Sequence, residues 1–269
     1  MKKLLFIINP MAGRQQAQTD LYKMVKIFAD HDYEVTVYPT RARLDCTRKV
    51  LEDAGRFDLV VCCGGDGTLN EMVSGMMQRQ DRRPMGYIPL GSTNDLAVSL
   101  RLPTRVEEAA LRAVTGNEFH MDVGTLNDRY FNYIAAFGAF TETSYATPQE
   151  IKNALGHLAY ILEGVKSLGK ILPIHVKITA DDEQFEEDYL FGAVTNTISL
   201  GGVLKLDPEK VLLDDGMYEL LLVKNPTNAL EAQAMLTAIM TLGGISQQKI
   251  KQQIEHTELV KNEMFKYIN

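Results

Sequence analysis

Short apolar runs alternate with amphipathic segments in the first half of the chain. Four runs have the length and composition of buried strands, at residues 4–8, 34–38, 59–63 and 85–89. Apolar residues at helical spacing predict helices over residues 18–29, 46–54, 69–77, from residue 96 onward, and over 106–114. Strands that alternate with helices are typical of parallel crossovers. The first half therefore predicts an α/β domain with a parallel sheet.

The pattern changes near residue 118. Two strand-like runs, residues 119–126 and 130–137, are joined through Asn127-Asp128, a dipeptide pattern typical of hairpin turns. Further on, the pattern predicts strands over residues 174–179, 184–196 and 217–223, and helices over residues 151–168 and 229–242. We therefore expect an α/β domain at residues 1–118 and a β-rich, β-sandwich-like domain at residues 119–269, with an approximate boundary and with C-terminal strands able to return to the first domain.

A glycine-rich turn follows the third predicted strand, with the sequence Gly64-Gly65-Asp66-Gly67-Thr68. Such a turn lets backbone N–H groups approach an anion closely, with the N-terminus of a helix behind it. The carboxylate of Asp66 would repel a phosphate unless a cation lies between them, which indicates Mg²⁺ or a proton-accepting role at this turn. The alternative is a tight turn in which Asp66 caps the helix.

Other polar or glycine-rich loops follow the remaining strands of the predicted sheet. Because ligands of such sheets bind beyond the carboxyl ends of the strands, residues 9–13, Thr40 and residues 91–95 join the glycine-rich turn at one edge. Asp66 and Asp95 both lie there, and paired carboxylates with hydroxyl and backbone N–H groups suit Mg²⁺-assisted phosphoryl transfer. The alternative is that Asp95 caps the next helix while Asn94 fills a turn.

Composition narrows the class of protein. The 269 residues are 45% hydrophobic and 23% charged, as in ordinary globular proteins, and the net charge of −7 argues against a nucleic-acid partner. Cys62 and Cys63 point to opposite faces of a predicted strand and Cys46 has no evident mate, which indicates reduced thiols and a cytoplasmic location. No run approaches the ~20 apolar residues that a transmembrane helix needs.

Several motifs occur in a fixed order along most of the chain. They read Asn-Pro-x-Ala-Gly at residues 9–13, Gly-Gly-Asp-Gly-Thr-Leu-Asn-Glu at 64–71, Ile-Pro-x-Gly-Ser-x-Asn-Asp at 88–95, Leu-Gly-x-x-Ala-Tyr at 155–160 and Asp-Asp-Gly at 214–216. This combination resembles the diacylglycerol kinase catalytic family, which includes bacterial lipid kinases and the sphingosine and ceramide kinases.

The resemblance implies a nucleotide-binding α/β domain and a β-sandwich-like domain, with the site in a cleft between them. It implies ATP as donor, Mg²⁺ as cofactor, and the hydroxyl group of diacylglycerol or a related lipid as acceptor, giving phosphatidic acid. By matching motif, the implied nucleotide contacts are Asn9, Pro10, Met11, Ala12, Gly13, Thr40, Gly65, Asp66, Gly67, Thr68, Leu69, Asn70, Glu71 and Ser92.

The resemblance also implies catalytic and metal-binding roles. Asp66 and Asp95 would be the catalytic residues and would organise the catalytic Mg²⁺, partly through water. A further, structural Mg²⁺ would be held by the Asp215 side chain and the backbone carbonyl groups of Leu212 and Met217.

Two positions depart from the family pattern. Family members carry a late Asp-Gly-Glu whose glutamate is proposed to deprotonate the lipid hydroxyl group. Here Glu255, Glu258 and Glu263 follow Gly244, and none of them comes after Asp-Gly, so no general base is assigned. Ser92 stands where threonine is usual, which keeps the hydroxyl group.

Other functions remain open at this point. NAD kinases and phosphofructokinases also use a Gly-Gly-Asp-Gly turn, so the acceptor could be soluble, and a non-catalytic lipid- or nucleotide-binding relative is the third alternative. We expect a protein that is peripheral at the inner membrane surface and meets its lipid substrate transiently; a homodimer is left open.

A lipid acceptor also requires apolar contacts. The candidate wall for lipid is residues 197–203, whose glycines allow close approach of a ligand. Further apolar candidates, for which a core position is the alternative, are Tyr133, Ile134, Phe137, Phe140, Ile198 and Leu200.

Overall fold

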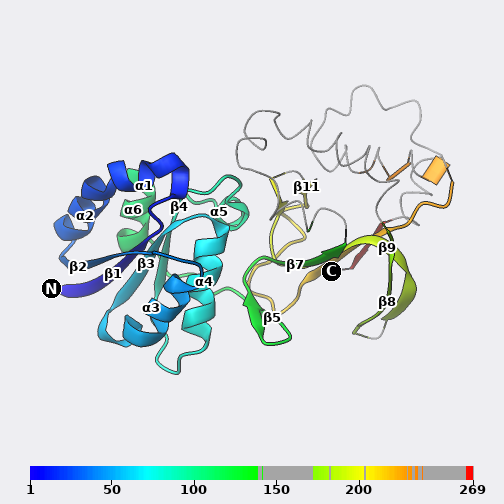
Figure 1. Ribbon diagram of the computed structural model, residues 1–269, viewed down its shortest axis with the longest axis horizontal. Coiled ribbons are helices and arrows are strands. Elements are labelled where there is room, and N and C mark those ends of the chain that lie inside the picture. The colour runs from blue at the N-terminus through cyan, green and yellow to red at the C-terminus, as the bar shows by residue number, and fades with distance from the viewer. Residues whose placement is uncertain are drawn as a thin grey trace. The chain divides into compact units, whose positions relative to one another are not determined.

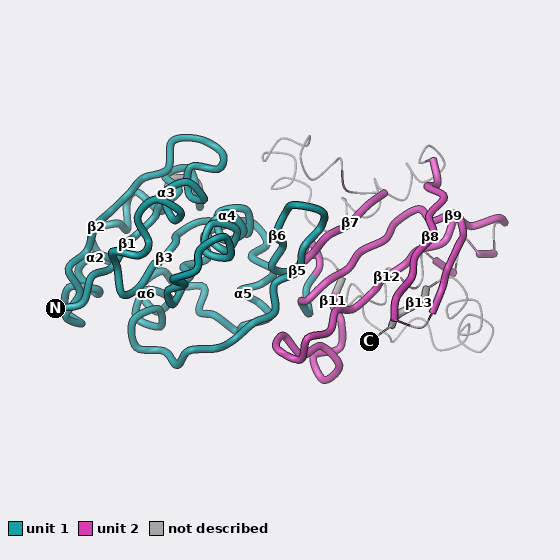
Figure 2. Tube along the Cα trace, turned by 90° about the horizontal axis from the view of Figure 1, so that it is seen from below, with its two compact units in different colours: residues 1–133, 197–199 teal, residues 134–196, 200–269 magenta. Residues whose placement is uncertain are grey.

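A computed structural model describes residues 1–138, 141, 172–181, 183–202, 204–228, 230–231, 234–235, 238 and 265–268. The chain divides into a first unit, Met1–Tyr133 with Thr197–Ser199, and a second unit, Ile134–Asn196 with Leu200–Asn269 (Figure 2). These bounds differ from the expected domains of residues 1–118 and 119–269. The helix predicted over residues 151–168, the motif at 155–160, most of the helix predicted over 229–242, and Phe140, Glu255, Glu258 and Glu263 lie outside the described residues.

The first unit contains the predicted parallel sheet. Its strands, in the spatial order β2-β1-β3-β4, are β1 (Lys2–Ile8), β2 (Tyr33–Pro39), β3 (Leu59–Gly64) and β4 (Met85–Pro89). All three strand pairs are parallel. The whole of β3 is buried, because a central parallel strand is covered on both faces and therefore reads as a continuous apolar run.

Helices cover the sheet on both faces (Figure 1). They are α1 (Gln16–Thr19), α2 (Leu21–Asp30), α3 (Asp45–Asp53), α4 (Asp66–Met77), α5 (Asp95–Ser99) and α6 (Val106–Thr115), with short 3₁₀ turns η1 (Ala12–Gln15) and η2 (Ala54–Arg56). Each face of the sheet has its own hydrophobic core, and successive residues of β1 point alternately into the two. Phe6 packs with α2 and α6, and Ile7 packs with α3 and α4. The single helix predicted over residues 18–29 was wrong, because the chain breaks at Asp20 between α1 and α2.

The hairpin predicted at Asn127-Asp128 is confirmed, with shorter strands. Strand β5 (Gly124–Leu126) pairs antiparallel with β6 (Arg129–Phe131), and Asn127 takes the left-handed conformation at φ 52°. The strand predicted over residues 130–137 was wrong, since β6 ends at Phe131 and β7 (Ile134–Gly138) belongs to another sheet. The reason is tertiary: Tyr133 packs against the core of the first unit, which separates the two strands.

The second unit is β-rich, as predicted, and the strands of its main sheet pair antiparallel. Its sheet has the order β13-β12-β9-β7, with β8 also paired to β9. The strands are β8 (Ile174–Ala180), β9 (Glu183–Thr195), β12 (Glu219–Lys224) and β13 (Phe265–Ile268), and the short β10 (Ser199–Leu200) pairs with β11 (Leu204–Lys205). The strands predicted over residues 174–179, 184–196 and 217–223 are thereby confirmed close to their predicted bounds.

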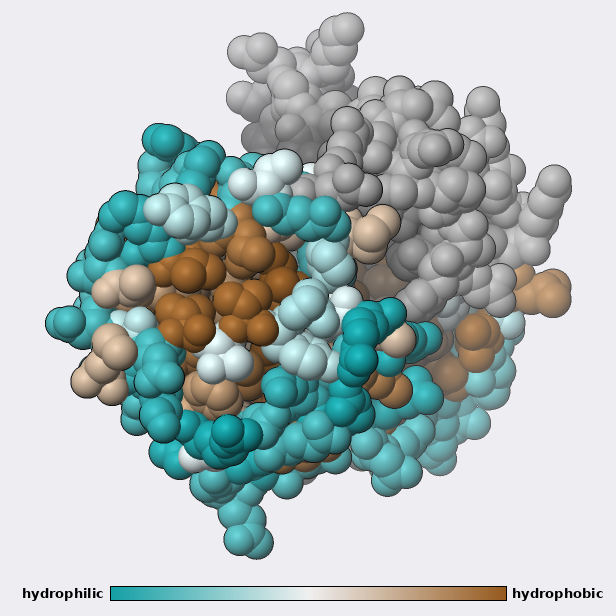
Figure 3. Space-filling view, turned by 60° about the vertical axis from the view of Figure 1, so that its left-hand side comes forward, coloured by the Kyte–Doolittle hydropathy of each residue, from teal (hydrophilic) through white to brown (hydrophobic). Residues whose placement is uncertain are grey.

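The surface of the first unit is not uniformly polar. On the face shown in Figure 3, apolar residues gather into one area that is rimmed by hydrophilic residues. Among the residues that the structure describes, no helix combines the length and the apolar character that crossing a bilayer requires.

Candidate active site

The loops after β1 and β3 meet at the carboxyl edge of the parallel sheet. The backbone N–H of Asn9 donates to the Cys63 carbonyl oxygen at 2.9 Å, and Asn9 Nδ2 donates to Thr68 Oγ1 at 3.3 Å. The order β2-β1-β3-β4 places the point where the strand order reverses between β1 and β3. Open α/β sheets bind ligands in the crevice beyond such a point. The edge predicted from the sequence is therefore assembled within the first unit.

The loops after β3 and β4 also lie against each other. Leu90 N–H donates to the Gly64 carbonyl oxygen at 2.7 Å, and a Cβ added to Gly91 would lie 2.6 Å from the Cα of Gly65. Asn94, in the left-handed conformation at φ 51°, closes the second loop by accepting from Gly91 N–H at 2.7 Å through its Oδ1. Apart from its chain neighbours and the backbone of its own helix, no heavy atom of the described residues lies within 4 Å of a Cβ added to Gly67. The glycines thus allow two backbones to touch while leaving the start of α4 open.

Asp66 stands in the first turn of α4 and is not its cap. Gly65 occupies the cap position, so the helix-capping alternative for the Asp66 carboxylate is not what the structure shows. Asp66 Oδ2 accepts from the Thr93 hydroxyl at 3.1 Å, whereas Oδ1 is shielded from solvent and has no hydrogen-bond partner among the described residues. Burial, and then the charge of Asp95, raise the pKa of Asp66. An anionic oxygen without a donor fits a bound cation, so the site suits the Mg²⁺ that the family resemblance implies.

Asp95 lies in the first turn of α5, where Asn94 occupies the cap position. Its side chain is 1% exposed, and its Oδ1 accepts from the Ser199 hydroxyl at 2.6 Å. Ser199 is separated from Asp95 by 104 positions in the sequence. Residues 197–203 were predicted to lie beside lipid, and this contact was not predicted, because no local pattern marks a hydroxyl group that reaches a distant carboxylate.

Several predicted nucleotide contacts have structural partners. The Glu71 carboxylate accepts from the backbone N–H groups of Leu44 at 2.9 Å and Cys46 at 3.3 Å, and so satisfies the start of α3. Asn70 Nδ2 donates to the Tyr130 carbonyl oxygen at 3.4 Å. The Leu69 side chain is buried in the core on the α3 and α4 face. The side chains of α4 beyond Thr68 thus support the loop from behind, and the ligand roles of these residues stay predictions.

The rest of the predicted nucleotide set lies along the same edge. Ala12 is buried at the start of η1, Gly13 has a left-handed φ of 59°, and Met11 is 70% exposed. Pro10 is half-buried and Ser92 is exposed. The set is therefore brought to one edge, and the side chains of Ala12 and Leu69 belong to the two hydrophobic cores.

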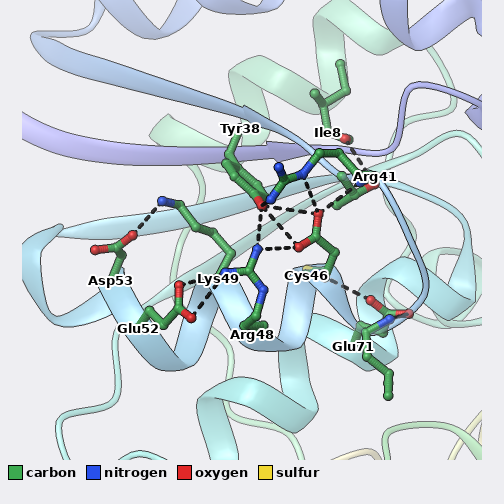
Figure 4. A network of polar contacts seen from close by, with 12 residues as sticks. Ile8, Tyr38, Arg41, Cys46, Arg48, Lys49, Glu52, Asp53 and Glu71 are labelled. Atoms are coloured by element: carbon green, nitrogen blue, oxygen red, sulfur yellow. Dashed lines mark hydrogen bonds and ion pairs between the residues drawn. The ribbon is translucent and has the colours of Figure 1, made fainter.

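A charged network fixes the segment that carries Thr40 (Figure 4). Thr40 N–H donates to the Ile8 carbonyl oxygen at 2.9 Å. Burial alone would raise the pKa of Asp45, but hydrogen bonds from Arg48, from the Arg41 backbone and from the Tyr38 hydroxyl outweigh it and lower this pKa to about 2. Asp45 is therefore ionised at neutral pH and ties α3 to the end of β2.

The turn at residues 214–216 lies in the second unit. Asp215 Oδ1 accepts from Met217 N–H at 2.9 Å, and the Leu213 carbonyl oxygen accepts from Asn196 Nδ2 at 3.2 Å. The nearby Glu219 carboxyl group is 3% exposed, and burial, followed by the charge of Asp215, raises its pKa to about 7. Within the described ranges there is no cluster of three or more His, Cys, Asp or Glu side chains suited to a metal ion. The metal role of Leu212, Asp215 and Met217 therefore stays a prediction that depends on carbonyl groups.

Comparison with known proteins identifies the family. A model of the diacylglycerol kinase catalytic domain matches residues 3–126. The diacylglycerol kinase of Bacillus subtilis (strain 168) is 37% identical over 246 residues, covering 91% of this chain and 80% of the relative. The chain belongs to the diacylglycerol kinase family. The resemblance predicted from the motifs is confirmed, and the chain is a kinase of this family.

Two further relatives agree with this assignment. The diacylglycerol kinase of Staphylococcus saprophyticus is 32% identical over 242 residues, covering 90% of this chain and 77% of the relative. A crystal structure of a diacylglycerol kinase from Bacillus anthracis str. Sterne is similar with a TM-score of 0.67 at 27% identity, covering 88% of this chain and 76% of that one. The similarity therefore extends beyond the parallel sheet to most of the chain.

Proposed function

We propose that this family member transfers the γ-phosphoryl group of ATP to the hydroxyl group of diacylglycerol or a related lipid, in a Mg²⁺-dependent reaction that gives phosphatidic acid. The observation that carries the proposal is Asp66, whose shielded and unpartnered Oδ1 lies at the glycine-lined edge together with Asp95. The relatives named diacylglycerol kinase support this choice of acceptor.

Each part of the edge has a proposed role. The open backbone at Gly67 and the N-terminus of α4 would bind phosphate oxygens, while Asn9 and Thr40 border the nucleotide. Bound Mg²⁺ would neutralise charge between the phosphates and the carboxylates. Asp66 would hold it through Oδ1, and Asp95 would complete the acidic pair.

The reaction itself is an in-line displacement. The acceptor oxygen forms a bond to the γ-phosphorus, the bond from that phosphorus to the β–γ bridging oxygen breaks, and ADP leaves. The acceptor hydroxyl group loses its proton to a base that we do not assign, since the described residues carry no matching Asp-Gly-Glu. Positioning and charge neutralisation supply most of the catalysis in such reactions.

We also propose the structural cation at the turn of Asp214-Asp215-Gly216. Its ligands would be the Asp215 carboxylate with the carbonyl oxygens of Leu212 and Met217, a set of hard oxygen ligands that suits Mg²⁺. Burial and the charge of Asp215 raise the pKa of the nearby Glu219 to about 7, and a cation bound at the turn would favour the ionised form of this carboxyl group.

We propose that the protein reaches its acceptor by transient association with the membrane surface. The apolar area of the first unit offers contact with lipid, while the net charge of −7 disfavours tight electrostatic binding to anionic lipids (Figure 3). The homodimer left open by the sequence stays untested.

The deciding experiment uses labelled ATP with mixed micelles, with and without diacylglycerol, followed by extraction of the product into organic solvent. We expect label in the lipid phase that depends on both Mg²⁺ and diacylglycerol, and none from an Asp66→Asn control. Efficient transfer to NAD or a sugar phosphate instead would establish a soluble acceptor. ATP binding without turnover would establish a non-catalytic relative.

A further inference from the structure

A three-residue segment of the chain leaves the second unit and joins the first. The residues on either side of Thr197–Ser199 belong to the second unit, whereas the segment itself packs with the first. It contacts α5, the short helix that begins at Asp95. Its conformation is therefore set by the same unit that holds the candidate active site.

Hydroxyl groups make this contact. The Thr197 and Ser99 hydroxyl oxygens lie 2.6 Å apart, and Ile198 N–H donates to Ser99 Oγ at 3.0 Å. Ser199 N–H donates to Thr197 Oγ1 at 3.2 Å. The backbone of the segment is thus held at two successive N–H groups, which leaves little freedom for the side chain of Ser199.

The Ser199 hydroxyl ends this network at the catalytic candidate. Its Oγ donates to Asp95 Oδ1 at 2.6 Å, within the range typical of a hydroxyl group that bonds an ionised carboxylate. Ser199 is 3% exposed and Asp95 is 1% exposed, so water does not compete for this bond. The bond therefore favours the rotamer of Asp95 in which Oδ1 faces Ser199.

We infer that Ser199 is a positioning residue that orients the carboxylate of Asp95 for phosphoryl transfer, with Thr197 and Ser99 holding it in place. The inference rests on the proposed function. Asp95 stands in a helix of only five residues, from Asp95 to Ser99, and the Asn94 side chain bonds Gly91 instead. The Ser199 hydroxyl, on another segment, helps to keep the carboxylate from turning away from the edge.

The alternative is that Ser199 only satisfies a buried carboxylate and so stabilises the fold. The two roles differ in what Ser199→Ala changes. A positioning role predicts a kcat lowered about 10- to 100-fold, as is usual when a partner of a metal-site residue is removed, with the KM for lipid within about twofold. It also predicts a higher Mg²⁺ requirement. A purely stabilising role predicts a lower melting temperature alone.

The test measures Ser199→Ala beside Thr115→Val, a matched control that removes an exposed hydroxyl bond at the end of α6. Circular dichroism and thermal melting establish that each variant is folded. Calorimetry then compares the binding of ATP with Mg²⁺ and of ATP in a chelator. We expect Ser199→Ala to weaken the binding of ATP in the presence of Mg²⁺ and to leave the binding of ATP in a chelator unchanged. Thr115→Val should match the wild type in every measurement.

The outcomes are separable. A folded Ser199→Ala protein with wild-type kcat and Mg²⁺ requirement overturns the inference, as does equal weakening of ATP binding with and without Mg²⁺. If Ser199→Ala does not fold, Ser199→Cys, which keeps the volume and a weaker donor, is judged by the same criteria. If the wild type does not phosphorylate lipid, the proposed function is wrong. The ratio of ATP affinities measured with and without Mg²⁺ still decides the role of Ser199.

Discussion

The substitution Asp66→Asn separates what the Asp66 carboxylate costs in folding stability from what it contributes to catalysis. Among the described residues, one oxygen of the wild-type carboxylate is shielded and has no hydrogen-bond partner, and the charge of Asp95 lies nearby. Leaving a buried acceptor unsatisfied costs about 1–3 kcal/mol. The amide keeps an acceptor for the Thr93 hydroxyl and removes the negative charge. The amide nitrogen then stands in the place of Oδ1 and still lacks a partner, so the gain comes from removing a buried negative charge beside Asp95. We expect the variant to gain about 1 kcal/mol in free energy of unfolding, while losing at least about 100-fold in kcat.

The pH dependence follows from the raised pKa. An acid whose pKa is higher in the folded than in the unfolded state contributes stability below its usual pKa of 3.8, and this contribution is lost as the pH rises through the folded value. The asparagine does not titrate. The advantage of Asp66→Asn over the wild type should therefore be small at or below the usual pKa of 3.8 and grow as the pH rises above it.

The assay is a pair of thermal melts at each pH, without and with Mg²⁺ and ATP. A gain of about 1 kcal/mol corresponds to a melting temperature higher by about 2–4 °C in a domain of this size. Ligand should stabilise the wild type more than the variant, which closes the gap. A variant that melts lower than the wild type without ligand, or that keeps activity within about threefold of it, would refute the reasoning.

Three further substitutions test the architecture of the site. Gly91→Ala should lower the free energy of unfolding by about 1–3 kcal/mol, because its Cβ would lie 2.6 Å from the Cα of Gly65. The matched control Gly67→Ala, whose Cβ has open space, should melt like the wild type. Equal melting temperatures of the two variants would contradict the packing argument. Glu71→Ala should lower the free energy of unfolding by about 0.5–2 kcal/mol, because the start of α3 loses its acceptor. Glu71→Gln, which keeps an acceptor oxygen, should lose less in urea denaturation. Identical denaturation curves for the wild type and both variants would count against the capping role. Asp215→Ala should lower Mg²⁺-dependent activity without weakening ATP binding in calorimetry. A loss of ATP affinity as large as that measured for Asp66→Asn would rule out the structural cation.

The local predictions that held depend on interactions within one stretch of chain. Local signals were enough to predict the strands at residues 34–38 and 59–63 and the hairpin at Asn127-Asp128. The alternation of side chains in a strand and the sequence of a tight turn each depend on only a few neighbouring residues. The predictions that failed were tertiary. The helix expected over residues 18–29 breaks at Asp20. The strand expected over residues 130–137 divides where Tyr133 packs against the core that α3 and α4 share with the sheet.

The sequence by itself determined the α/β and β-rich halves, the parallel sheet, and the glycine loops that hold Asp66 and Asp95 at one edge, because each depends on local periodicity and on where strands end. Only the tertiary structure decided how the side chains there are used. Glu71 accepts from the start of α3, and one oxygen of Asp66 has no partner among the described residues. Ser199 reaches Asp95 from a segment that returns to the first unit. The physical reason is that a polar side chain takes its role from the donor that folding brings to it, and that donor is often distant in sequence.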